Sequence, residues 1–216
     1  MPTNDRFAGF SPDAFGFYAE LHVDNSKAFW EANKQRYLES VRAPLEALAR
    51  ELEGAFGEWH MFRPYRDLRF TKDRRPYKEH QGLLFGGRGP SVTGGQYVQL
   101  SREGMYVGFG AYQMREDQLA RYRRAVADDR AGGQLEEILA ELTALGYVLE
   151  GETLKRAPQG FPLDHPRVAL LKRKGVFAGA DYEPAEWMYG PEALERIAKV
   201  FADGERLCAW LRAHVA

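Results

Sequence analysis

The chain has 216 residues, a length that fits one large domain with a substantial core. Its 44% hydrophobic and 28% charged residues are ordinary globular values, and its net charge of −1 argues against a nucleic-acid binder that acts through the field of the whole molecule. The single cysteine, Cys208, excludes an internal disulfide and a cysteine metal cluster and fits a reducing compartment. The first six residues contain no apolar signal region and no apolar run approaches membrane length, so we expect a cytoplasmic protein without a membrane partner.

The N-terminal part is expected to be helical. Ser11-Pro12-Asp13 predicts the start of a helix that runs to about Val23, because serine caps, proline suits the first turn and aspartate favours the positive end. Asp24-Asn25-Ser26 predicts the start of a second helix, whose apolar stripe continues to Phe56. Pro44 should kink or restart this second helix.

Four residues of the second helix allow two interpretations: Trp30, Asn33, Lys34 and Tyr37. The first is a core stripe with polar residues at its rim. The second is that Asn33 and Lys34 reach a ligand.

A basic segment follows at residues 63–80, with seven Lys/Arg against three Asp/Glu and therefore a net charge of +4. Prolines and aromatic residues are spaced through it, which is unlike a disordered charged tail. Read as a strand over residues 66–71, the period of two places Leu68 and Phe70 on the core face. Asp67 and Arg69 then share the opposite face, about 7 Å apart, and the carboxylate can hold the guanidinium in one orientation.

The basic segment could serve as scaffold or as a site. An ion-pair lattice along a sheet edge would stabilise the fold and discourage edge-to-edge aggregation. An anion site is the functional alternative, because arginine forks match phosphate or carboxylate and lysine adds a point charge. A nucleic-acid face is the third possibility.

The next elements are a glycine-rich loop and a hairpin. Residues 85–95 contain five glycines, which indicates a flexible connector or a mobile lid but no P-loop, since no Gly-Lys-Ser/Thr closes it. Residues 96–101 and 105–110 predict two strands joined by a tight turn. Gly108 and Gly110 leave one face of the second strand without side chains, which permits close approach by a helix or a ligand.

The C-terminal part is expected to be helical and rich in loops. A helix from Glu116 to about Arg130 should break at Gly132-Gly133, and the next should end with Gly146 as its cap. Tyr147 to Glu150 predicts a strand. A final amphipathic helix is expected over residues 190–215.

A second basic segment, residues 155–174, carries six Lys/Arg and one Asp, or +5, whereas residues 181–205 carry −5. Asp164 is expected to cap a short helix that starts at Pro166. His165 between them serves either structural hydrogen bonding or acid/base and ligand contact.

The sequence also resembles a known family. Residues 66–78 read Arg-Asp-Leu-Arg-Phe-Thr-Lys-Asp-Arg-Arg-Pro-Tyr-Lys. Further matching segments are Gly9-Phe10, Trp30-Glu31-Ala32-Asn33-Lys34, Gly95-Gln96-Tyr97, residues 154–161 and Asp164-His165-Pro166. On these residues the chain resembles the family called domain of unknown function 2461, whose run reads R-D-x-R-F-x-K-D-K-x-P-Y-K. Arg74 stands where lysine is usual and keeps the charge. The resemblance covers nearly the whole chain, implies a single-domain α+β protein, and carries over no catalytic residues.

We therefore predict one α+β domain over residues 1–216, with a helical part at 11–56, a sheet-forming centre at 63–112 and a helical, loop-rich part at 115–216. A mostly antiparallel sheet should contain the 96–101/105–110 hairpin and the 66–71 strand, packed against several helices. No metal or cofactor is expected. The five histidines lack metal-ligand spacing, and no dinucleotide fingerprint, nucleophile elbow or kinase motif occurs.

Two hypotheses for function remain. The first is a protein that binds, and in one version acts on, a small anionic ligand such as a phosphate- or carboxylate-bearing compound. Its candidate ligand residues are Arg66, Asp67, Arg69, Lys72, Tyr77, Lys78, Tyr97, Lys155, Arg156 and His165. The second is a module that binds nucleic acid or a protein partner through the basic segments 63–80 and 155–174. Whether the protein is an enzyme stays open at this point.

Overall fold

The computed structural model describes residues 6–70, 72–89 and 91–216. The chain divides into two compact units, each assembled from segments that are distant in sequence. The first unit contains the chain up to Phe85, Tyr97–Val107 and Asp181–Lys199, and the second contains Gly86–Gln96, Gly108–Ala180 and Val200–Ala216.

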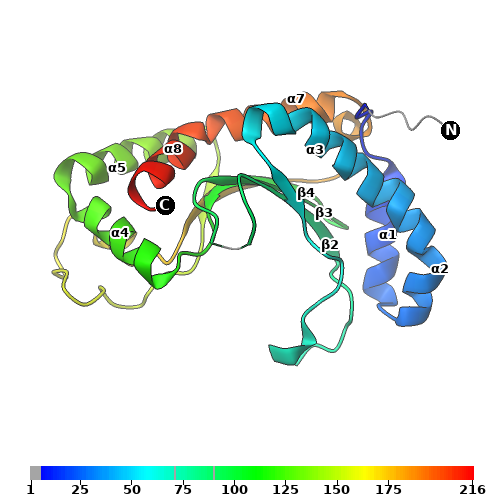
Figure 1. The fold of residues 1–216 in the computed structure, drawn as a ribbon, viewed down its shortest axis with the longest axis horizontal. Coiled ribbons are helices and arrows are strands. Elements are labelled where there is room, and N and C mark those ends of the chain that lie inside the picture. The colour runs from blue at the N-terminus through cyan, green and yellow to red at the C-terminus, as the bar shows by residue number, and fades with distance from the viewer. Residues whose placement is uncertain (1–5, 71, 90) are drawn as a thin grey trace. The chain divides into compact units, whose positions relative to one another are not determined.

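Helices dominate the two ends of the chain, as the sequence predicts (Figure 1). The α-helices are α1 (Pro12–Val23), α2 (Lys27–Tyr37), α3 (Ala43–Phe56), α4 (Glu116–Ala127), α5 (Asp129–Ala144), α6 (Val168–Leu171), α7 (Glu192–Asp203) and α8 (Glu205–His214). A π-helical turn, Leu38–Arg42, joins α2 to α3, and 3-10 turns lie at Leu68–Phe70 and Glu186–Tyr189.

The strands confirm the predicted α+β class. They are β1 (Trp59–Met61), β2 (His80–Phe85), β3 (Gly95–Ser101), β4 (Gly104–Ala111), β5 (Val148–Glu150) and β6 (Val176–Tyr182). Their order in the described sheet is β1-β2-β3-β4-β6-β5. The β1–β2 and β5–β6 pairs are antiparallel, and the short turn between β3 and β4 requires the same of the predicted hairpin.

The helical part of the first unit packs an aromatic core. Phe17 of α1 lies 6.0 Å from the Trp30 ring and 5.8 Å from the Tyr37 ring, and all three side chains are buried. The Tyr37 hydroxyl donates to Gln81 Oε1 of β2 at 2.7 Å, and Gln81 Nε2 donates to the Phe62 carbonyl at 2.6 Å. These bonds satisfy a buried amide between helix and sheet, as burial requires. The core-stripe interpretation therefore holds for Trp30 and Tyr37.

The expected caps hold in part. Ser26 accepts a hydrogen bond from the Phe29 N–H at 3.1 Å and caps α2. Ser11 occupies the N-cap position of α1, but its Oγ is buried without a hydrogen bond, so the predicted capping bond is wrong. Pro44 restarts the helix as predicted. It has no N–H to offer the Ser40 carbonyl, and the backbone widens into the π-helical turn just before it.

The predicted strand over residues 66–71 is wrong. In its place the chain forms a single bridge between Tyr65 and Tyr77 and the 3-10 turn at Leu68–Phe70. The Asp67 carboxylate accepts from the Arg69 backbone N–H at 3.1 Å, a local bond that competes with a strand ladder. Thr71 and the side chain of Phe70, at the end of the predicted strand, lie outside the described part of the chain.

Two predicted helix boundaries are also wrong, and each involves a glycine. The break after α4 falls at Asp128, whose side chain accepts from the Ala131 N–H at 2.8 Å and starts α5. Gly132 lies inside α5, where a Cβ would come within 2.2 Å of the Val126 carbonyl oxygen. The final helix breaks at Gly204, where a Cβ would lie 2.1 Å from the Phe109 ring. Both glycines serve close packing.

Other glycines behave as expected. Gly146 has φ +90° and ends α5. Its N–H donates to the Thr143 carbonyl, and the Tyr147 N–H donates to the Leu142 carbonyl. Gly110 permits a close approach, but the approaching group is the backbone of the neighbouring strand β6 at Val176 and not the predicted helix or ligand.

The glycine-rich loop between β2 and β3 is anchored within the second unit. Gln118 Nε2 donates to the Ser91 carbonyl at 3.1 Å and to Thr93 Oγ1 at 2.9 Å. Pro90 lies outside the described residues. In the part of the chain that the structure describes, no helix is long and apolar enough to cross a membrane.

Candidate functional site

The basic segment forms a narrow arm, described for residues 63–70 and 72–79, that projects from the start of β2 (Figure 1). The Arg66 N–H donates to the Pro76 carbonyl at 2.9 Å, and the Lys78 N–H donates to the Pro64 carbonyl at 2.8 Å. These two bonds flank the Tyr65–Tyr77 bridge. Pro64 and Pro76 lack donors of their own, so the ladder ends after one bridge.

The base of the arm is fixed to α2 and to the turn before it. The Tyr77 ring stacks on Trp30 with centroids 4.4 Å apart and an interplanar angle of 10°. Asn25 pairs with the Tyr77 backbone, accepting from its N–H at 3.0 Å and donating to its carbonyl at 3.2 Å. Tyr77 is only 3% exposed. This predicted ligand residue therefore has a structural position.

Four charged side chains of the arm form an ion-pair lattice. Arg66 pairs with Asp73, and Arg75 pairs with Asp73 at 2.7 Å and with Glu79 at 2.5 Å. His22 Nδ1 of α1 lies 2.7 Å from the other Glu79 oxygen. The Arg75 hydrogen bonds hold the pKa of Asp73 well below its usual range. The scaffold interpretation of the segment fits these residues.

Asp67 and Arg69 form a second pair near the tip of the arm. Arg69 donates from Nε at 2.9 Å and from Nη2 at 2.6 Å to the two carboxylate oxygens. This fork holds the pKa of Asp67 well below its usual range. The expected orientation of an arginine by this aspartate is confirmed, but the Arg69 side chain is 76% exposed and lines no pocket among those described.

Other cations of the arm have no such partner. Arg63, Lys72 and Arg74 are exposed. Within the described residues no carboxylate lies in ion-pair distance of any of them. They supply the excess positive charge of the arm.

A different environment surrounds Lys78, where the arm meets the sheet. Its Nζ lies 5.3 Å from the centroid of the Phe62 ring, in cation–π distance. The side chain is half-buried, and none of the described carboxylates pairs with it. Burial, helped by the charge of Arg63, lowers the pKa of Lys78.

Aromatic residues of β1, β3 and β4 continue this surface. The Phe62 ring lies 5.4 Å from His60 and 6.2 Å from Tyr97, and Tyr97 lies 6.4 Å from Tyr106. All four side chains are partly exposed. Gly82 of β2 makes room for them, because a Cβ there would lie 2.4 Å from the Tyr97 hydroxyl oxygen. We call this surface of the first unit the Lys78 face: His60, Phe62, Lys78, His80, Tyr97, Gln99 and Tyr106.

His80 begins β2 two residues before Gly82 and so shares its face. Burial, together with the nearby charges of Lys78 and Arg66, lowers the pKa of His80 to about 4. The imidazole is therefore neutral near pH 7 and can accept a proton or a hydrogen bond. The Tyr97 hydroxyl donates to Gln99 Oε1 at 2.8 Å on the same face.

Sequence reasoning found Lys78 and Tyr97 of this face and missed Phe62, His80 and Gln99. A signal was present, because the period of two in 80–84 places His80, Gly82 and Leu84 on one side of the strand. The missing information was the pairing of β1 with β2, which brings Phe62 beside Gly82: the Phe62 N–H donates to the Gly82 carbonyl at 3.1 Å.

The remaining predicted residues belong to the second unit. Lys155 and Arg156 are exposed on the turn-rich stretch. His165 Nδ1 accepts from the Arg167 N–H at 3.0 Å, so this ring starts the turn of α6 and the predicted cap by Asp164 is wrong. The structural role foreseen for His165 is the one observed.

The second basic segment is not uniformly exposed. Arg167 is 8% exposed, donates to the Val126 carbonyl at 2.7 Å and pairs with Asp129 at 2.7 Å. Arg173 donates to the Glu150 carbonyl, and Lys174 pairs with Glu152. A continuous basic surface over residues 155–174 is therefore absent from the described structure.

The described side chains include no group of three His, Cys, Asp or Glu residues that could hold a metal ion. Asn33 donates to the Phe29 carbonyl of its own helix at 2.9 Å, and Lys34 is exposed. The alternative role of these two residues as ligand contacts has no support in this geometry.

These features define an α+β protein with a basic arm and a half-buried lysine on an aromatic sheet face. The family model described as "Conserved hypothetical protein (DUF2461)" matches residues 13–210, and the chain belongs to this family. A comparison with curated proteins gives no match.

Proposed function

We propose that the first unit binds a small anionic ligand, a phosphate- or carboxylate-bearing compound, on the Lys78 face. The observation that carries the proposal is Lys78 itself, a half-buried ammonium without a carboxylate partner among the described residues. Burying a charge is costly unless it is paired. A bound anion would supply the missing partner.

The neighbours of Lys78 favour the same ligand class. Phe62 and Tyr97 offer ring surfaces against which a flat or apolar part of a ligand can pack. Neutral His80 can donate or accept a hydrogen bond beside the ammonium group. Exposed Arg63 adds a second positive charge, which its effect on Lys78 shows to be close.

The proposal narrows the predicted site. Lys78 and Tyr97 remain, whereas Arg66, Asp67, Arg69 and Tyr77 already use their polar groups or their rings within the arm. If the ligand reacts, His80 is the group of this face suited to accept a proton. We assign the protein to the cytoplasm in the same proposal, because its single cysteine fits a reducing compartment.

A second candidate function is nucleic-acid binding by the arm. Arg63, Lys72 and Arg74 are exposed and have no ion-pair partner among the described residues, and Tyr65 is 45% exposed in the same segment. Such a surface suits a phosphate backbone with stacking of an unpaired base.

The test of the first proposal is a thermal-shift screen with inorganic phosphate, nucleotides and small carboxylates. A ligand at 100 times its dissociation constant adds about 2.7 kcal/mol of stability. Lys78→Met should abolish the shift, whereas the matched variant Lys72→Met, on the exposed part of the arm, should retain it.

An unchanged shift in Lys78→Met would remove the Lys78 face as the site. No shift in the wild type, together with gel retardation of single-stranded DNA that Lys72→Met weakens, would favour the second function. The affinity for DNA should then fall steeply with salt.

A further inference from the structure

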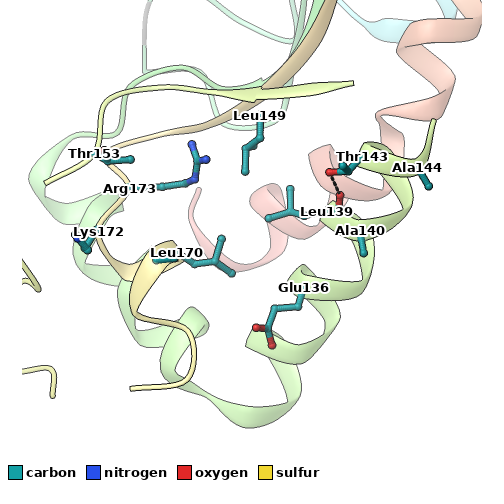
Figure 2. Close-up of a pocket in the computed structure, with 11 residues that line it drawn as sticks. Glu136, Leu139, Ala140, Thr143, Ala144, Leu149, Thr153, Leu170, Lys172 and Arg173 are labelled. Atoms are coloured by element: carbon teal, nitrogen blue, oxygen red, sulfur yellow. Dashed lines mark hydrogen bonds between the residues drawn. The ribbon is translucent and has the colours of Figure 1, made fainter. Parts of the chain in front are cut away.

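A groove of about 870 Å³ lies in the second unit, between α5, β5 and α6 (Figure 2). Small-molecule sites in proteins have volumes of roughly 300–1,000 Å³. The groove is separate from the Lys78 face, since every residue that lines it belongs to the second unit.

The walls of the groove are mainly aliphatic. Leu139 and Ala140 come from α5, Leu149 from β5 and Leu170 from α6. Figure 2 shows the three leucine side chains converging on one space. The hydroxyl of Thr143 is already used within α5, where it donates to the Leu139 carbonyl at 2.8 Å. This lining suits an acyl chain or an aryl ring.

Arg173 places a positive charge against these leucines. Its side chain is half-buried, and Figure 2 shows the guanidinium beside Leu149 and above Leu170. Its Nη1 donates to the Glu150 carbonyl at 2.9 Å, and none of the described carboxylates pairs with it. The pKa of Arg173 is lowered by burial. A guanidinium in such a position retains N–H donors for an anion.

The other charges of the groove do not neutralise Arg173. Glu136 lies at the far end of the groove and is 3.6 Å from Arg167 Nη1, which balances its charge. Lys172, next to Arg173, also lines the groove. One end is therefore positive and the middle is apolar.

We propose that this groove binds an amphipathic carboxylate, with its acyl or aryl tail against Leu139, Leu149 and Leu170 and its carboxylate on Arg173. A carboxylate matches one guanidinium in charge and in its two-oxygen geometry. The inference does not depend on the function proposed for the Lys78 face.

The experiment is titration calorimetry of the full chain with sodium octanoate and with octanol. We expect saturable octanoate binding, and octanol binding at least tenfold weaker, because a charge-assisted hydrogen bond to the carboxylate is lost. Arg173→Gln should weaken octanoate binding about tenfold and leave octanol binding unchanged. Arg173→Lys, which keeps the charge, should recover part of the affinity.

Two tryptophan variants on the surface of α5 complete the test. Ala140 is exposed and lines the groove, so Ala140→Trp should fill it and abolish binding of both compounds. Gln134 is exposed on α5 outside the groove, and Gln134→Trp should bind as the wild type does. Melting curves of each variant establish that it is folded. The comparison of octanoate with octanol on the wild type needs no variant at all.

Three results would overturn the proposal. The first is no saturable octanoate binding to the wild type, and the second is equal binding of octanol, which assigns the groove to an uncharged apolar occupant. The third is octanoate binding that Lys78→Met weakens and Arg173→Gln does not, which places the carboxylate on the Lys78 face.

Discussion

The basic arm and the Lys78 face adjoin in the sequence, and they differ in whether their charged side chains form ion pairs. On the arm, Asp67, Asp73 and Glu79 each accept from an arginine, so the charges hold backbone in place. On the Lys78 face an ammonium group is half-buried, with no carboxylate partner in the described part of the chain, next to a histidine kept neutral. Paired charges therefore stabilise the arm, and the charge of Lys78, which no described carboxylate pairs, is the basis of the proposed site.

The largest expected effect tests whether the base of the arm is scaffold. Tyr77→Ala removes the ring that stacks on Trp30 and should destabilise the protein by about 3–5 kcal/mol, the range for a buried aromatic residue. Tyr77→Phe keeps the ring and should change stability by about 0.5 kcal/mol or less, since no described hydrogen bond uses the hydroxyl. Urea unfolding of both variants measures this. A ligand-induced shift that Tyr77→Phe abolishes would return Tyr77 to the site and break the comparison.

A smaller effect concerns the neutral state of His80. The pKa of His80 is about 4 in the folded protein and about 6.5 in the unfolded chain. The contribution of this difference to the free energy of unfolding is therefore complete above pH 6.5. The contribution is lost as the pH falls from 6.5 through 4, and it amounts to about 3 kcal/mol at most.

The measurement is urea unfolding of the wild type and of His80→Gln at pH 7 and at pH 4. The wild type should lose more stability than the variant between these two pH values. Equal losses would show that His80 is not desolvated and would weaken the contrast between arm and face.

The smallest expected effect is the difference in stability between two lysine variants, measured in the absence of ligand. Lys78→Met removes a half-buried unpaired charge and should raise stability, by about 1 kcal/mol or less. Lys72→Met removes an exposed charge and should have no measurable effect. Differential scanning calorimetry at low and at high salt checks both. A loss of stability in Lys78→Met would reveal a structural partner for the ammonium group and remove the reason for placing a ligand there.

Much of the fold follows from the sequence. The caps and the apolar spacing predicted α1 and α2, and Leu135, Ile138 and Leu142 are buried on α5 as their period indicates. The β3–β4 hairpin follows from two alternating runs around a tight turn. These signals are local, so one sequence is enough to show them.

The errors arise where tertiary packing decides. Gly132 reads as a helix breaker but remains within α5, and Gly204 interrupts a helix that the sequence predicts to be continuous over residues 190–215. At each of these positions another group comes too close for a Cβ. The arm reads as a strand, but its prolines and the Asp67 bond to the Arg69 backbone limit it to one bridge. In the same way the sequence shows Lys78 and Tyr97 as candidates, while their proximity to Phe62 and His80 depends on the order of β1, β2 and β3.

The π-helical turn at Leu38–Arg42 has a consequence for how this chain tolerates changes in length. Such a turn accommodates one residue more than an α-helical turn, and each residue of an α-helix corresponds to a rotation of about 100°. It thus sets the angular phase between the Trp30–Tyr37 stripe of α2 and the Leu45–Leu52 stripe of α3. Deleting a single residue from 38–42 would restore a regular α-helix and leave the two stripes in nearly the same phase, because the turn absorbs one residue that a regular helix does not need. The turn should therefore accept the loss of one residue, whereas the same deletion within α2 or α3 would rotate one stripe by about 100° away from the core.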